Sequence, residues 1–161
     1  KKKKNTTINK GTDHFQAEIW SSQDTSIDTI NFTPDWVWIK SRTNADTQVM
    51  FDTVRGATKR LSSSGTTEEQ TKTDELSAFN SDGYTLGTGD NVNRASNDYV
   101  SWNWKAGGAA SSNTDGTNIT SSVSVNSTAG FSIVSYTGSG TISDTVGHGL
   151  GSTPKWIILK K

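Results

Sequence analysis

The stretch FTPDWVWIKSR, residues 32–42, places a proline shortly before a compact apolar run. Pro34 cannot donate a hydrogen bond to a β-ladder, so it marks a break in the chain. Residues 36–39 are apolar at every position, which is typical of a central strand that is covered on both faces. The stretch therefore predicts a β-strand at the centre of a sheet.

The residues on both sides of this stretch predict further strands with polar turns between them. Residues 99–105 alternate in character, with Val100, Trp102 and Trp104 on one face of a half-buried strand. Other short apolar runs predict strands at 15–20, 27–30, 49–51 and 131–136. No segment has the periodicity of an amphipathic helix. We therefore predict an all-β protein, an antiparallel β-sandwich of jelly-roll or lectin-like type with extra C-terminal strands.

The composition of the 161 residues argues against several classes of function. Lys and Arg number 16, and so do Asp and Glu, so no overall positive charge attracts nucleic acid. The chain has no cysteine, which excludes disulfides and thiolate metal sites. No apolar run is long enough to predict a transmembrane helix. The basic run Lys1–Lys4 predicts a disordered or tag-like tail over residues 1–10.

The phrase TPDWVWIK recurs near the end of the sequence as TPKWIILK. The aromatic strand at 15–20 recurs at 131–136, and Trp36 recurs as Trp156, so we interpret the pattern as an internal repeat. The small residues at 106–113 predict a hinge. The repeat divides the chain into a β-sandwich module at 11–108, a Gly/Ser/Asn-rich linker with weak strand signal at 109–130, and the opening strands of a second repeat at 131–161.

Several longer motifs carry a resemblance to a known family. FTPDWVWIK, FNSDGYTLG, YVSWNWKAGG, AGFSIVSYTG and TVGHGLGSTPKWIILKK resemble a repeated module of marine bacteriophage proteins, and the likeness extends over residues 15–161. Those proteins are mostly described as virion structural or tail-fibre-like. The resemblance therefore implies a viral structural protein located in the virion. Such modules usually continue past this final lysine, so we expect the second unit to be partial.

The apolar strands of the second repeat are expected to need cover, because exposed strand edges pair with other chains. They could pack on the first module, pair with a neighbouring subunit or pair with further sequence of a longer protein. We expect a non-enzymatic fibre, tail or capsid-decoration module that assembles as a homo-oligomer, or with other virion proteins, by strand pairing and apolar burial. The expected assembly edge consists of Phe131, Ile133, Tyr136, Trp156, Ile157 and Leu159.

The main alternative is a module that attaches the virion to a host-surface glycan. Trp20 and Tyr99 lie opposite the apolar faces of their strands, so we expect them on the surface as ligand contacts. Four other tryptophans form two pairs at a spacing of two residues, which could make an aromatic platform for sugar rings. The apolar run at 36–39 nevertheless favours a core position for them. These four are Trp36, Trp38, Trp102 and Trp104.

Few residues follow the patterns of catalysis or cofactor binding. His14 and His148 lack the neighbours of a catalytic triad, and the glycine-rich residues 147–151 lack the spacing of a phosphate loop. A polysaccharide hydrolase would need a carboxylate pair, which no pattern selects. We therefore expect no enzyme and no cofactor other than calcium. The possible calcium ligands, whose simpler interpretation is turn formation, are Asp90, Asn91, Asn93 and Asp98.

Overall fold

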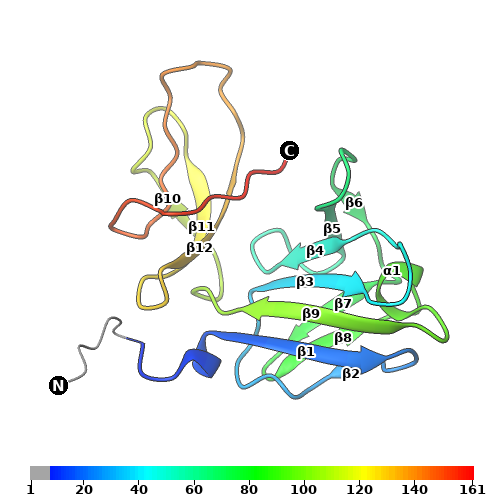
Figure 1. The fold of residues 1–161 in the computed structure, drawn as a ribbon. Coiled ribbons are helices and arrows are strands. Elements are labelled where there is room, and N and C mark those ends of the chain that lie inside the picture. The colour runs from blue at the N-terminus through cyan, green and yellow to red at the C-terminus, as the bar shows by residue number, and fades with distance from the viewer. Residues whose placement is uncertain (1–7) are drawn as a thin grey trace.

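The computed structural model describes residues 8–161, which fold into antiparallel sheets with little helix (Figure 1). The largest sheet has six strands in the order β1-β9-β3-β4-β5-β6. These strands are β1 (Phe15–Ser21), β3 (Trp36–Ser41), β4 (Val49–Asp52), β5 (Lys59–Ser62), β6 (Gln70–Thr71) and β9 (Asp98–Trp104). The apolar run at 36–39 lies in β3, which has a strand partner on each side, so the predicted central strand is confirmed.

A second sheet of three strands packs against one face of the large sheet and completes a β-sandwich. Its strands are β2 (Ser26–Ile27), β7 (Leu76–Asn80) and β8 (Gly83–Leu86), in the order β2-β8-β7. The helices of the described chain are short: the 3-10 helix η1 (Gly11–Asp13) and α1 (Asp90–Asn93). None of the helices within residues 8–161 has the length and apolar character needed to cross a membrane. The predicted all-β, antiparallel sandwich is confirmed.

The core of the sandwich lies between the two sheets. Val37 and Ile39 of β3 have no exposed surface, and neither have Tyr99 of β9 and Tyr84 of β8. Trp20 of β1 is 6% exposed and stacks on the Tyr99 ring, with the two ring centroids 5.5 Å apart. The expectation that Trp20 and Tyr99 are exposed ligand contacts is therefore wrong.

The reason for this reversal is that the second sheet covers the more polar face of β9. Ser101 and Asn103 share that face with Tyr99 and are buried as well. The Tyr84 hydroxyl donates a hydrogen bond to Ser101 Oγ at 2.8 Å, and Asn103 Nδ2 donates to the same oxygen at 2.9 Å. A face with polar residues can thus be the inner one when most of its polar groups find partners in the core, although Asn103 Oδ1 has none among residues 8–161.

A third sheet, which we call the C-terminal unit, follows the sandwich in the chain. It consists of β10 (Ser111–Asn113), β11 (Ser121–Asn126) and β12 (Phe131–Tyr136), paired in that order. The predicted linker at 109–130 therefore contains two strands of this sheet. In Figure 1 the C-terminal unit stands beside the sandwich, and the end of the chain crosses back toward it. The Lys160 ammonium donates to the Gly65 carbonyl at 2.5 Å.

The C-terminal tail, residues 152–161, contains no strand, although 156–159 was expected to form one. Trp156, Ile157 and Leu159 are 71%, 72% and 74% exposed. The topology of the sandwich explains this outcome. β1 and β3, the counterparts of β12 and the tail, pair with β9 between them and not with each other. The described residues supply no strand at the equivalent position, so the tail has no ladder to join.

The junction between the sandwich and the C-terminal unit is held by hydrogen bonds. The buried carboxylate of Asp35 accepts hydrogen bonds from the amides of Ala106 at 2.8 Å and Gly108 at 3.2 Å. Ser124 of β11 holds the same loop, because its Oγ accepts from the Gly107 amide at 2.9 Å and donates to the Gly108 carbonyl at 2.7 Å. The residues that were expected to begin a hinge are therefore anchored on both sides.

Candidate functional site

The outer face of the large sheet carries the four paired tryptophans. In the strand register, Trp36 lies opposite Trp104 and Trp38 lies opposite Trp102. The ring centroids are 4.5 Å apart in the first pair and 5.8 Å apart in the second. All four side chains are only half-buried. The core position that the sequence favours for them is therefore wrong, and they form an aromatic surface outside the sandwich.

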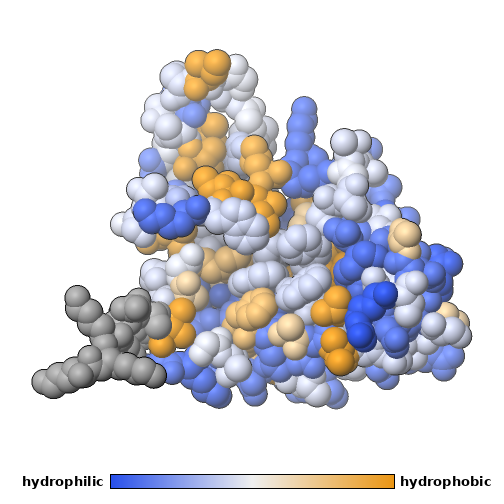
Figure 2. All heavy atoms as spheres, viewed as in Figure 1, coloured by the Kyte–Doolittle hydropathy of each residue, from blue (hydrophilic) through white to orange (hydrophobic). Residues whose placement is uncertain are grey.

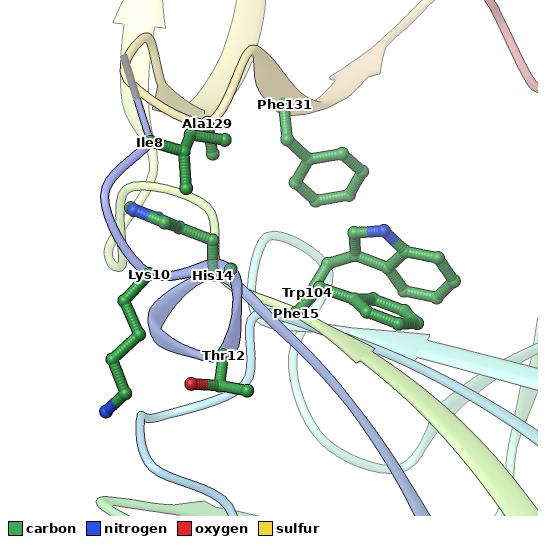
Figure 3. Close-up of a pocket in the computed structure, with 9 residues that line it drawn as sticks. Ile8, Lys10, Thr12, His14, Phe15, Trp104, Ala129 and Phe131 are labelled. Atoms are coloured by element: carbon green, nitrogen blue, oxygen red, sulfur yellow. The ribbon is translucent and has the colours of Figure 1, made fainter. Parts of the chain in front are cut away.

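Two phenylalanines extend this aromatic surface. The ring of Phe15 in β1 lies 4.9 Å from that of Trp104. Phe131 of β12 stacks on Trp36 at 5.9 Å and on Trp104 at 6.2 Å, with interplanar angles of 24° and 22°. Figure 3 shows Phe131 reaching from the C-terminal unit toward Trp104 and Phe15 of the large sheet. Aromatic stacking thus fixes the C-terminal unit against part of the outer face.

Two cavities that share Trp104 open on this side of the molecule. The first, which we call the tryptophan cleft, has a volume of about 340 Å³ and is lined by Trp38, Lys40, Gln48, Trp102, Trp104 and Trp156. The second, which we call the N-terminal pocket, has a volume of about 520 Å³ and lies among η1, β1 and β12 (Figure 3). Figure 2 shows the surface hollowed where the two units meet, with apolar atoms along its border. Volumes of this size are typical of small-molecule sites.

Lys40 supplies a fixed positive charge at the tryptophan cleft. It continues the alternation of Trp36 and Trp38 along β3, so its side chain leaves the sheet on the same face. The ammonium donates hydrogen bonds to the carbonyl oxygens of Asn44 at 2.8 Å and Asp46 at 3.3 Å. These two contacts hold the charge in place without neutralising it.

Neutral polar groups complete the rim of the cleft. The Trp38 indole donates to Ser63 Oγ at 3.0 Å, and Ser63 Oγ donates to Gln48 Oε1 at 3.2 Å. This chain of hydrogen bonds orients the Gln48 amide, whose nitrogen donates to no group within the described residues 8–161. The indole nitrogens of Trp102 and Trp104 have no acceptor in the part of the chain that the structure describes, and neither is fully buried. The cleft therefore combines ring faces with free hydrogen-bond donors.

The two histidines have local partners. His14 Nδ1 lies 3.2 Å from Asn126 Nδ2, and His148 Nδ1 accepts a hydrogen bond from the Leu150 amide at 3.1 Å. Neither forms the hydroxyl–imidazole–carboxylate arrangement that a catalytic triad needs. Within residues 8–161, no three His, Cys, Asp or Glu side chains are grouped so that they could hold a metal ion.

The four possible calcium ligands lie in and beyond α1, and each has a partner within the chain. The partners are Arg94 for Asp90, Glu75 for Asn91, Gln23 for Asn93 and Ser21 for Asp98. These contacts tie the α1 region to the β1–β2 turn and to the residue before β7, as turn chemistry would. Calcium binding by this loop stays a prediction.

The residues predicted to form one assembly edge lie in two places. Phe131 and Ile133 are half-buried in β12, which is an edge strand with β11 as its partner. Tyr136 at the end of β12 is 41% exposed. The other three residues of the set, Trp156, Ile157 and Leu159, are exposed on the C-terminal tail. In this single chain the set therefore makes no continuous edge, and its role in assembly stays a prediction.

Sequence patterns do not single out Lys40 or Gln48 as site residues. The signal for Lys40 is its place two residues after Trp38, which puts both side chains on one face of β3. Gln48 lies in the connection before β4, and no pattern in the sequence brings it to the tryptophans.

The fold and the site together define a class of protein: an all-β sandwich whose large sheet presents an aromatic cleft beside a small second unit. The sequence matches the model of a family described as a domain of unknown function, DUF7483, over residues 10–161. The chain belongs to this family. No curated protein and no solved structure matches it.

Proposed function

We propose that this protein is a non-enzymatic binding module whose tryptophan cleft takes a saccharide. The observation that carries the proposal is the pair of cross-strand tryptophan contacts on the outer face of β3 and β9, left half-exposed beside a cavity of about 340 Å³. A half-exposed aromatic surface of this kind marks an interaction site in a soluble protein. The proposed role needs no catalytic residue.

The chemistry of the cleft fits a sugar ring. The face of an indole ring is electron-rich because of its quadrupole, so it attracts the weakly positive C–H hydrogens on the flat face of a pyranose. Sugar hydroxyls both donate and accept, and around the cleft the Lys40 ammonium, the Gln48 amide and the free indole N–H of Trp102 are available to them. A purely apolar ligand would leave these donors unpaired, at a cost in free energy.

A binding titration tests the proposal. The protein is screened against a panel of neutral, carboxylated and sulfated oligosaccharides, and bound members are titrated by calorimetry. We expect millimolar to micromolar dissociation constants and about tenfold weaker binding by Trp102→Ala, because one aromatic contact is lost. The matched control is Ile142→Ala, which removes a fully exposed apolar side chain that lines neither cavity. Absence of binding to the whole panel, or equal binding by Trp102→Ala, would overturn the proposal.

We also propose that this binding attaches a virion to a host surface. The support is the resemblance of the repeated motifs to tail-fibre-like modules of marine bacteriophages. Mass spectrometry of purified particles from a phage that encodes this chain tests whether the protein is part of the virion. Peptides of the sandwich module in intact particles are the expected result. Their presence in the lysate but not in the particles would overturn it.

Assembly between copies is a second candidate function, favoured by the exposed tail. Large apolar residues at 156–159 are mostly solvent-exposed, and such segments tend to find a partner. Light scattering after size exclusion gives the mass of the protein in solution. We expect an oligomer that dissociates in the double variant Ile157→Asp, Leu159→Asp. A monomer at all concentrations would remove this candidate and leave saccharide binding untouched.

A further inference from the structure

The charge around the aromatic surface narrows the ligand class. Resting on the proposed function, we infer that the saccharide is acidic and carries carboxylate or sulfate groups. The titratable side chains that line the two cavities are Lys40 in the tryptophan cleft and Lys10 and His14 in the N-terminal pocket. Among residues 8–161, no aspartate or glutamate lines either cavity. The whole chain has 16 basic and 16 acidic residues, so a cavity lining that contains basic but no acidic residues favours a negatively charged ligand.

Lys40 is the central element of the inference. Two of its three ammonium protons go to the carbonyls of Asn44 and Asp46, which leaves one for a ligand. The carboxylate of Asp46, whose backbone carbonyl holds the Lys40 ammonium, is itself engaged by Arg94 at 3.0 Å and by the Asn97 amide at 3.2 Å. A cation that is fixed, uncompensated and next to ring faces is suited to an anionic group on a sugar.

The N-terminal pocket offers a second positive end. Lys10 pairs with Asp13 at 3.1 Å, but both side chains are more than half exposed, so the pair is weak and can exchange for a ligand anion. The Asn126 amide donates to His14 Nδ1, which leaves Nε2 of the ring as a donor. Trp104 lines both cavities, so a ligand of several sugars that reaches from one cavity to the other meets Lys40 at one end and Lys10 at the other. Figure 3 shows His14 and Lys10 on the side of the pocket away from Phe131.

Single-stranded nucleic acid also combines stacking rings with negative charge, but it fits less well. It carries a charge on every nucleotide and is bound by grooves with continuous positive charge. Here the described lining of the two cavities supplies two lysines, one of which is already paired with Asp13, and the whole chain is neutral. The sparse charge matches a saccharide with an occasional acidic group.

The test compares ligands that differ only in charge. Hexamers of galacturonic acid and their methyl esters are titrated into the full chain, together with a sulfated oligosaccharide, its desulfated form and oligothymidylate. We expect each acidic ligand that binds to do so about tenfold more tightly than its neutral counterpart. Raising the salt from about 0.05 M to about 0.5 M should weaken acidic ligands and leave neutral ones unchanged.

Variants assign the effect to Lys40. Lys40→Gln should lose most of the preference for the acidic ligand while it keeps the binding of the neutral one. Lys72→Gln removes the same charge from a residue that lines neither cavity, and it should behave like the wild type. Equal affinity for acidic and neutral ligands, or tighter binding of oligothymidylate, would overturn the inference and leave the aromatic cleft in place. Failure of every saccharide would overturn the proposed function itself.

Discussion

The two faces of the large sheet differ in burial, and the difference is not the one that their composition predicts. The inner face combines Val37 and Ile39 with Ser101 and Asn103, and all four are buried. The outer face carries the tryptophans, and it stays half-open. What covers a face decides its burial: the β2-β8-β7 sheet packs over the inner side, whereas the C-terminal unit covers only part of the outer side, where Phe131 stacks on Trp36.

This difference in burial predicts that the two faces of the sheet respond differently to substitution. Most polar groups of the inner face have partners within the chain, since its serine and asparagine hydrogen-bond to each other and to a core tyrosine, although Asn103 Oδ1 and Trp20 Nε1 have none among residues 8–161. On the outer face, the tryptophan rings are partly exposed, and the indole N–H groups of Trp102 and Trp104 have no acceptor within the described residues. We therefore expect substitutions on the inner face to change the free energy of unfolding, and substitutions on the outer face to change mainly ligand binding.

The largest expected effect contrasts one residue from each face. Ile39→Ala should lower the free energy of unfolding by about 2–5 kcal/mol, because it leaves a cavity in the core. Trp102→Ala, although it removes more atoms, should cost roughly 1 kcal/mol, because the side chain is half-exposed. Urea unfolding followed by circular dichroism measures both. Equal losses in the free energy of unfolding would show that the two faces contribute equally to stability, contrary to this account.

The next effect concerns what holds the C-terminal unit over the outer face. Asp35→Ala removes the acceptor of the Ala106 and Gly108 amides and of the Thr53 hydroxyl at 2.9 Å. Leaving buried donors unpaired should cost about 2–3 kcal/mol. Limited proteolysis should then cut within residues 106–113. Asp35→Asn keeps one acceptor oxygen and should lose less; resistance of both variants to protease would show that the junction does not depend on this carboxylate.

A smaller effect tests the polar part of the inner face. Tyr84→Phe removes the hydrogen bond to Ser101 and should cost about 1 kcal/mol near pH 7. Burial raises the pKa of Tyr84 and of Tyr99 above the usual value of a phenol, about 10. The stability that this contributes is complete below about pH 10. Above that pH the unfolded chain releases protons that the folded chain keeps, so the free energy of unfolding falls.

The alkaline part of this prediction has its own measurement. Unfolding in urea between pH 8 and pH 11 should show stability falling above about pH 10, by up to about 1.4 kcal/mol per pH unit for each buried tyrosine. Tyr84→Phe should reduce that slope, because one of the two phenols is gone. A slope that is the same in the variant would place Tyr84 outside the core.

The smallest effect lies at the second anchor of the junction. Ser124→Ala removes the hydroxyl that joins β11 to Gly107 and Gly108, and it should cost about 1 kcal/mol. The same urea experiment measures it. Ser122→Ala removes an exposed hydroxyl two residues earlier in β11, so it is the matched control and should change stability by less than about 0.5 kcal/mol. Equal effects of the two substitutions would mean that the hydroxyl does not hold the loop.

Local patterns predict much of this fold, and their limits are physical. The strands at 36–39, 99–105 and 131–136 follow from apolar runs and alternation, which report the backbone directly. Alternation says which residues share a face but not which face is covered, because that depends on the side of the sheet against which β8 packs. The sequence patterns therefore predict the wrong side of the sheet for Trp20 and Tyr99, and also for the paired tryptophans.

The C-terminal tail shows a second limit. Its sequence repeats β3, and apolar character alone predicts a strand there. β3 is stable as a strand because β9 and β4 pair with it, and those partners come from other parts of the chain. Strand formation is thus a property of the ladder, and a repeated phrase without its partners stays unpaired.

The most direct test of the central claim follows the tryptophan side chains themselves. The indole N–H signals in a ¹H–¹⁵N spectrum, assigned by single substitutions, are recorded during titration with the tightest-binding oligosaccharide of the panel. The outer-face signals of Trp38, Trp102 and Trp104 should shift in a saturable way, while that of the core residue Trp20 stays in place. If no indole signal shifts, or if Trp20 shifts as much as the others, the outer face is not the binding surface.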